Sequence, residues 1–136
     1  MKIGLLLPLV GLILGGTSVS AHHSFSAEFN EKDTVKLVGT VVRIDLVNPH
    51  VWVYVDVKNP DGTVANWAIE AGALNQMLRR GLRKEDFPVG SQVAVDGYRA
   101  KNGKNLASGR SVTFPDGRNF LLGASEGAPK DATDKK

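Results

Sequence analysis

The most regular stretch of the chain is HVWVYVDVK, residues 50–58. Valine occupies every second position from Val51 to Val57, and polar or aromatic side chains fill the positions between them. β-branched residues at a period of two predict a strand with one face in a core and the other face turned outward. The turn sequence NPDG follows at 59–62, with Gly62 placed for a positive φ, so the chain is expected to return as a second strand over 63–69.

The segments on either side of this hairpin also have strand patterns, interrupted once by a helical one. Residues 34–46 alternate like a strand, but the apolar phase changes at Val41 and Val42, which predicts a bulge. Asn48-Pro49 ends that strand, because proline lacks a ladder donor. A short amphipathic helix is expected from Leu74 to Gly81. Two further strands are predicted over 92–99 and 106–114, before a short terminal segment at 119–122.

Three strands, one short helix and two more strands follow one another, which is the order of an OB-fold. The fold class expected is therefore all-β with one short helix, a small five-stranded Greek-key barrel over residues 34–122. A β-sandwich or another small barrel stays open, because pairing cannot be read from one sequence. A polar arm at 22–33 precedes the barrel, and a small, charged tail at 123–136 is expected to be disordered.

Residues 1–21 have the pattern of a secretory signal peptide. A charged start is followed by an apolar run at 3–14 and by small residues that end at Ala21. The alternative, an uncleaved membrane anchor, needs about 17–25 apolar residues, and Pro8 weakens it further. We expect cleavage after Ala21, a periplasmic or secreted protein that begins at His22, and no stable membrane anchor after cleavage.

The composition excludes several classes of functional site. The chain has 136 residues, a net charge of +3 and no cysteine, so disulfide scaffolds, thiolate metal sites and iron–sulfur clusters are excluded. It lacks the sequence patterns of a serine-hydrolase elbow, a P-loop, a dinucleotide-binding loop and a zinc-protease helix. We therefore expect a binding module and no enzyme. The near-balanced charge and the predicted export also argue against a nucleic-acid partner.

The three histidines are the strongest candidates for a site. After cleavage, His22 would offer an α-amine and an imidazole on one residue, and His50 opens the polar face of the strand at 50–58. Nitrogen ligands of this kind favour Cu(II), so we expect copper bound by His22 and His50, with His23 as a substitute ligand. Both kinds of nitrogen must lose protons to bind, and binding should therefore weaken in mild acid. A frayed terminus and a turn histidine are the plainer alternatives.

The outward face of the predicted hairpin is the second candidate site. It carries Trp52, Tyr54, Asn66 and Glu70, and OB-folds bind ligands over this face. A small molecule, a glycan or an envelope protein would then be the partner. Alternatively, the two aromatic residues cover one end of the core or pack beneath the arm against Phe25 or Phe29. A structural role in an envelope complex is a third possibility.

Four motifs together resemble a family of small exported bacterial proteins catalogued only as a domain of unknown function. They are AHHSF at 21–25, NPHVW at 48–52, NWAIE at 66–70 and GYRAK at 97–101. The resemblance covers nearly the whole predicted mature chain and implies a periplasmic or secreted small β-barrel. It brings no ligands or catalytic residues, but it implies that the His22-His23 start and the Asn48-Pro49-His50 motif belong together.

Overall fold

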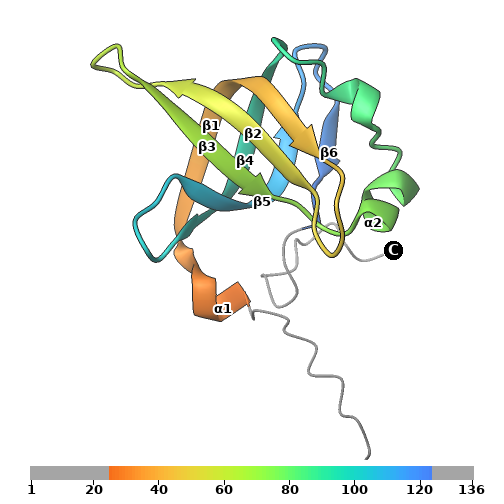
Figure 1. Cartoon of the computed structure of the whole chain (residues 1–136), viewed down its shortest axis with the longest axis horizontal. Coiled ribbons are helices and arrows are strands. Elements are labelled where there is room, and N and C mark those ends of the chain that lie inside the picture. Colours follow the sequence, from red (N-terminus) through yellow and green to blue (C-terminus); the bar gives the residue numbers. More distant parts are fainter. Residues whose placement is uncertain (1–24, 124–136) are drawn as a thin grey trace, which may run out of the picture.

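A computed structural model describes residues 25–123, which form a barrel with a short helix at its N-terminal end (Figure 1). In chain order its elements are α1 (Phe25–Glu28), β1 (Phe29–Asp45), β2 (Trp52–Lys58), β3 (Val64–Glu70), α2 (Leu74–Arg79), the 3₁₀ turn η1 (Lys84–Asp86), β4 (Gln92–Ala100), β5 (Leu106–Thr113) and β6 (Asn119–Leu121).

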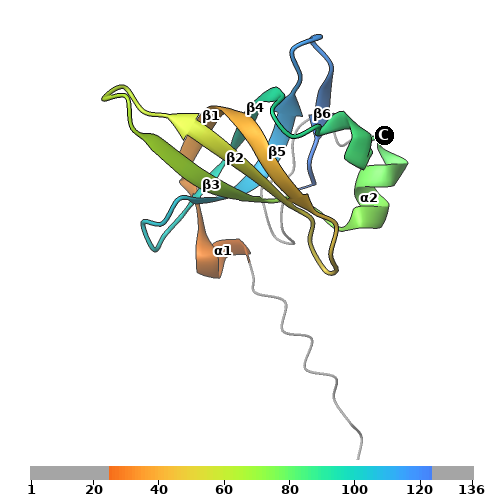
Figure 2. The same ribbon diagram turned by 45° about the horizontal axis from the view of Figure 1, so that its top comes forward.

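The strand pairing confirms the OB-like barrel. The sheet order is β3-β2-β1-β4-β5-β6, and a parallel pairing of β3 with β5 closes the ring. The long first strand pairs with both β2 and β4, and α2 lies between β3 and β4 in the chain, as this topology requires. Strand β6 is an addition that pairs only with β5 among the described strands (Figure 2).

The predicted bulge lies where the apolar phase changes. Val41 pairs with Val55 and Arg43 pairs with Tyr54, so Val42 is the extra residue in β1. A bulge bends its strand and increases the local twist. Here it lets the first half of β1 pair with β4 while the second half pairs with β2.

The inward face of β2 forms the centre of the core. Val51, Val53 and Val55 are fully buried, as the valine alternation predicts. The turn that follows has Gly62 at φ 87°, and Thr63 donates its backbone N–H to Oδ1 of Asp61 across 2.9 Å. The hairpin of β2 and β3 is therefore confirmed together with its turn.

The N-terminal arm is more ordered than its sequence predicts. The strand begins at Phe29 and not at residue 34, and α1 precedes it directly. Phe25 stacks on Phe29 with ring centroids 5.6 Å apart and meets Tyr98 edge-on at 5.3 Å. This second apolar cluster fastens the arm to β4. The polar residues 30–33 that follow Phe29 have no sequence pattern that predicts this contact.

No helix within residues 25–123 is long and apolar enough to cross a membrane. The predicted signal peptide, His22, His23 and nearly all of the predicted disordered tail lie outside the described residues, so those predictions remain predictions.

Candidate functional site: a pocket beside His50

Strand register places the site at one end of the β2–β3 hairpin. Trp52 is directly opposite Glu70, and both lie on the outward face of the hairpin. The ladder continues beyond the assigned strands, because Ala71 donates to the carbonyl of Val51 and Val51 donates to the carbonyl of Gly72. His50, two residues before Trp52, is therefore held on the same face of the hairpin, diagonally across from Glu70.

Nδ1 of His50 lies in contact with Oε1 of Glu70. The histidine side chain is 25% exposed, whereas the glutamate side chain is only 6% exposed. A buried carboxylate needs partners that replace its hydration, and His50 supplies one of them. The imidazole thus has one nitrogen engaged by the protein and remains accessible from outside.

A pocket of about 710 Å³ opens beside this pair. Residues from four parts of the fold line it: α1, the β1–β2 loop, the β2–β3 hairpin end and the β4–β5 turn. They are Ala27, Glu28, Val47, Asn48, Pro49, His50, Trp52, Glu70, Lys101 and Asn102. The volume falls within the range of about 300–1,000 Å³ that is usual for small-ligand sites.

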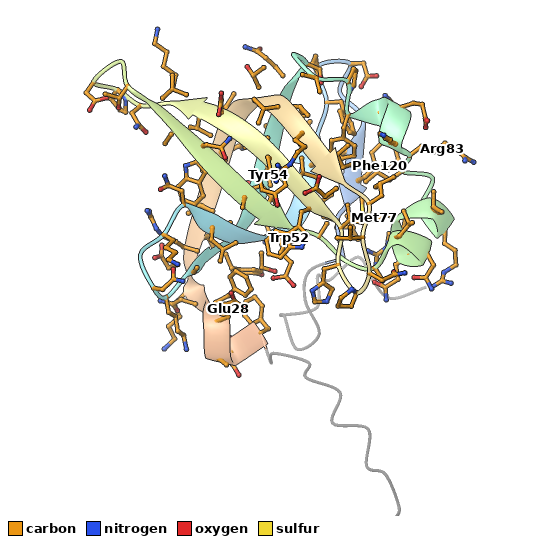
Figure 3. All side chains as sticks on the ribbon, viewed as in Figure 1. Glu28, Trp52, Tyr54, Met77, Arg83 and Phe120 are labelled. Carbon is orange, nitrogen blue, oxygen red and sulfur yellow. The ribbon has the colours of Figure 1, made fainter. Side chains whose placement is uncertain are left out.

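The arm is fastened at the rim of this pocket. Nζ of Lys101 donates to the carbonyl of Ser26 at 2.6 Å, and its backbone N–H donates to the carbonyl of Glu28 at 2.9 Å. Phe25, at the start of α1, is only 2% exposed. Figure 3 shows Glu28 on α1 beneath Trp52, with Tyr54 further along β2. Residues 25–28 are thus anchored at the pocket wall to which His50 also contributes.

The four residues predicted as a ligand-binding face separate into two pairs. Trp52 and Glu70 line the pocket, whereas Tyr54 and Asn66 do not. The guanidinium of Arg43 lies 3.9 Å from the ring centroid of Tyr54, and Asn66 donates to Asp56 across 2.8 Å. The outer part of the face is therefore occupied by its own neighbours. Phe25 and Phe29 pack on each other, and Phe25 also packs on Tyr98.

The sequence does not predict which distant residues meet His50 at the pocket. Lys101 and Asn102 sit in a turn, and nothing in their sequence connects them with His50. Glu70 was predicted only as part of a ligand face, and its contact with His50 depends on the hairpin register. A register argument applied to the NPDG turn could have found that contact, because the turn aligns residue 52 with residue 70.

Metal ligands are incomplete within the described part of the chain. Residues 25–123 contain no group of three or more His, Cys, Asp or Glu side chains that could hold a metal ion. Any site of three nitrogens at His50 must therefore recruit His22 or His23, whose positions the structure does not describe.

The clearest electrostatic shift lies outside this pocket. Arg118 donates to Asp86 at 2.8 Å, and this hydrogen bond holds the pKa of Asp86 below its usual range, with help from the backbone N–H of Arg83. Arg118 also donates to Asp116 at 2.7 Å and lowers the pKa of that carboxyl. None of these four residues lines the pocket, so we assign the network to stability.

Comparison with known proteins gives one match. The model of a family of unknown function, DUF6152, matches residues 11–109. No curated protein and no solved structure matches the chain.

Proposed function

This chain belongs to the family of unknown function DUF6152, and from its own residues we propose that it is an exported barrel that binds one Cu(II) ion beside His50. The ligands are the α-amine and imidazole of His22 together with the imidazole of His50, and His23 is the substitute ligand. The proposal includes removal of residues 1–21, because only cleavage after Ala21 gives His22 a free amine.

The observation that carries the proposal is that α1 and His50 share one pocket. Ala27 and Glu28 line it together with His50, and Phe25 is anchored just before them. His22 lies three residues before Phe25, and three extended residues span about 10–11 Å at most. The proposal therefore requires a separation between Phe25 and the copper site beside His50 that three extended residues can bridge.

The donor set also selects the metal. One amine and two imidazoles are nitrogen donors of the kind that Cu(II) prefers, and copper has the highest affinity among the common divalent first-row metals. Anchoring the arm before the metal arrives reduces the conformational entropy that is lost on binding. The site would then bind more tightly than a free peptide that begins with two histidines.

The test is a competitive Cu(II) titration of protein whose N-terminus is established as His22 by mass spectrometry. Two changes remove one ligand each: His50→Ala, and acetylation of the α-amine of His22, which keeps every side chain but removes that nitrogen as a ligand. We expect both altered proteins to bind at least about tenfold more weakly, since a lost ligand costs more than about 1.4 kcal/mol. Wild-type binding no tighter than that of a His-His peptide would refute the proposal.

A second candidate is a pocket for a small organic ligand, bound without metal. The observation in its favour is the combination of volume with the half-buried ring of Trp52 and the polar groups of Asn102 and Lys101. This candidate predicts that Trp52→Ala abolishes binding of a ligand from periplasmic extract to the metal-free protein, while acetylation of the α-amine leaves that binding intact. An unchanged affinity of the Trp52→Ala variant for that ligand would refute this candidate.

A further inference from the structure

The end of the barrel opposite the tip of the β2–β3 hairpin carries a cluster of basic side chains (Figures 1 and 2). Four cations lie within six residues, where the chain passes from α2 towards η1: Arg79, Arg80, Arg83 and Lys84. Arg80 is engaged by the fold, because its Nη1 donates to the carbonyl of Leu121 at 3.5 Å. Arg79, Arg83 and Lys84 are exposed, and no ion pair among the described residues involves their side chains. Three cations are therefore available to a negatively charged partner.

The acidic residues of the same segment leave most of this charge in place. Residues 73–90 contain two carboxylates, those of Glu85 and Asp86. Asp86 already accepts hydrogen bonds from Arg118 at 2.8 Å and from the backbone N–H of Arg83 at 2.8 Å. Within residues 73–90, only the exposed Glu85 therefore remains to oppose the three available cations. The segment presents an excess of positive charge to solvent.

Exposed apolar side chains gather around the same end of the barrel. Six large apolar side chains are exposed among the described residues, and four of them lie here: Leu46 and Val47 in the β1–β2 loop, Leu78 on α2, and Val89 before β4. Two grooves show that these segments are neighbours. The end of β1 lines a groove of about 670 Å³ with Lys84 and Val89, and the β1–β2 loop lines one of about 510 Å³ with Leu74 and Leu78. Clustered exposure of this kind is typical of an interaction surface.

We propose that this surface docks on a lipid bilayer that contains anionic phospholipid. We call it the basic face, and it consists of the three available cations and the four exposed apolar residues: Leu46, Val47, Leu78, Arg79, Arg83, Lys84 and Val89. Each cation close to an anionic bilayer strengthens binding about fivefold. The apolar side chains add to binding by inserting at the level of the head groups.

The relief of the basic face favours a bilayer over a protein partner. Its apolar side chains project from three separate segments, which two grooves divide. A protein partner needs a surface of matching shape, whereas a fluid bilayer adapts to an uneven one. The proposal is also independent of copper, because none of the three cations lines the pocket beside His50.

The first test measures flotation of the proposed mature protein, which begins at His22, with two kinds of vesicle. The apolar run at 3–14 must be absent, since it would bind any bilayer. One kind of vesicle is phosphatidylcholine alone, and the other is three parts phosphatidylcholine to one part phosphatidylglycerol. We expect binding to the mixed vesicles only, and weaker binding as salt screens the charges.

Equal binding to both kinds of vesicle, or no binding to either, would overturn the proposal. Binding to polyglutamate without binding to the mixed vesicles would also overturn it, and would indicate an acidic protein partner instead. These outcomes are decided with the wild-type protein and do not depend on the folding of any variant.

The second test compares two double variants that lower the net charge equally. Arg83→Gln with Lys84→Gln changes the basic face, whereas Lys36→Gln with Lys58→Gln changes exposed cations of β1 and β2 outside it. We expect the first variant to bind the mixed vesicles about thirtyfold more weakly, and the second to bind as the wild type does. Equal affinities of the two double variants would overturn the proposal, because binding would then follow net charge and not this face.

An apolar pair of variants completes the comparison. Val89 is 74% exposed on the basic face, and Val64 is 62% exposed at the far end of the hairpin. Val89→Gln should bind the mixed vesicles more weakly than the wild type, while Val64→Gln should bind equally well. An unchanged affinity of Val89→Gln would contradict insertion of the apolar side chains and overturn the proposal in this form.

Discussion

Replacement of Phe25 by alanine tests whether the arm is fastened to the barrel by its aromatic cluster. The ring is 2% exposed, and burial of a phenylalanine contributes about 1.5–3 kcal/mol. Its contacts with Phe29 and Tyr98 add about 0.5–1.5 kcal/mol each. Without this ring the arm can detach while the barrel stays folded, so the loss of stability cannot exceed the free energy that holds the arm in place. We therefore expect a loss of about 2–4 kcal/mol in the free energy of unfolding.

The assay combines urea denaturation with amide hydrogen exchange. Phe25→Ala should lower the unfolding midpoint and should release protection at Lys101, whose backbone N–H is bonded to the carbonyl of Glu28. Val64, which is 62% exposed at the far end of the hairpin, is the control, and Val64→Ala should change stability by less than about 0.5 kcal/mol. A loss below about 1 kcal/mol together with unchanged protection at Lys101 would refute the reasoning.

Three further substitutions test other parts of the account. Gly72→Ala should cost about 1–3 kcal/mol, measured by thermal denaturation, because its Cβ would meet the carbonyl oxygen of Gly123 at 2.4 Å; an unchanged melting temperature would contradict this. Val55→Ala should cost about 2 kcal/mol in urea denaturation by leaving a cavity at a fully buried position, and a loss below about 0.5 kcal/mol would show that the core is not centred there. Asp86→Asn should cost at most about 1 kcal/mol at neutral pH. Arg118 lowers the pKa of Asp86, so that contribution is present above the ordinary aspartate range and disappears as the pH falls through the lowered value; a pH-independent difference between the two proteins would argue against it.

The barrel could be predicted because its signals are local. The valine alternation of β2 identifies a buried face, NPDG identifies the turn, and the phase change at Val42 identifies the bulge. Each of these features follows from neighbouring residues, so one sequence is enough to read them. Their order along the chain then selects the OB-like topology.

The arm and the pocket could be predicted only in part, because they depend on contacts between distant segments. Residues 30–33 have no strand pattern of their own, and they lie in β1 between Phe29, which pairs with Ala100, and Thr34, which pairs with Tyr98. Residue type and the strand alternation together identify His50 and Trp52 as candidates. Their association with Glu70, Lys101 and α1 comes from register and barrel closure, which a single sequence does not state.

The most direct test of the central claim is the structure of the copper-loaded protein that begins at His22, with the metal located by anomalous diffraction at the copper edge. The account predicts one anomalous peak about 2.0 Å from an imidazole nitrogen of His50, at nitrogen-ligand distance from the α-amine of His22. A copper ion bound away from His50, or coordinated without the terminal amine, would contradict it.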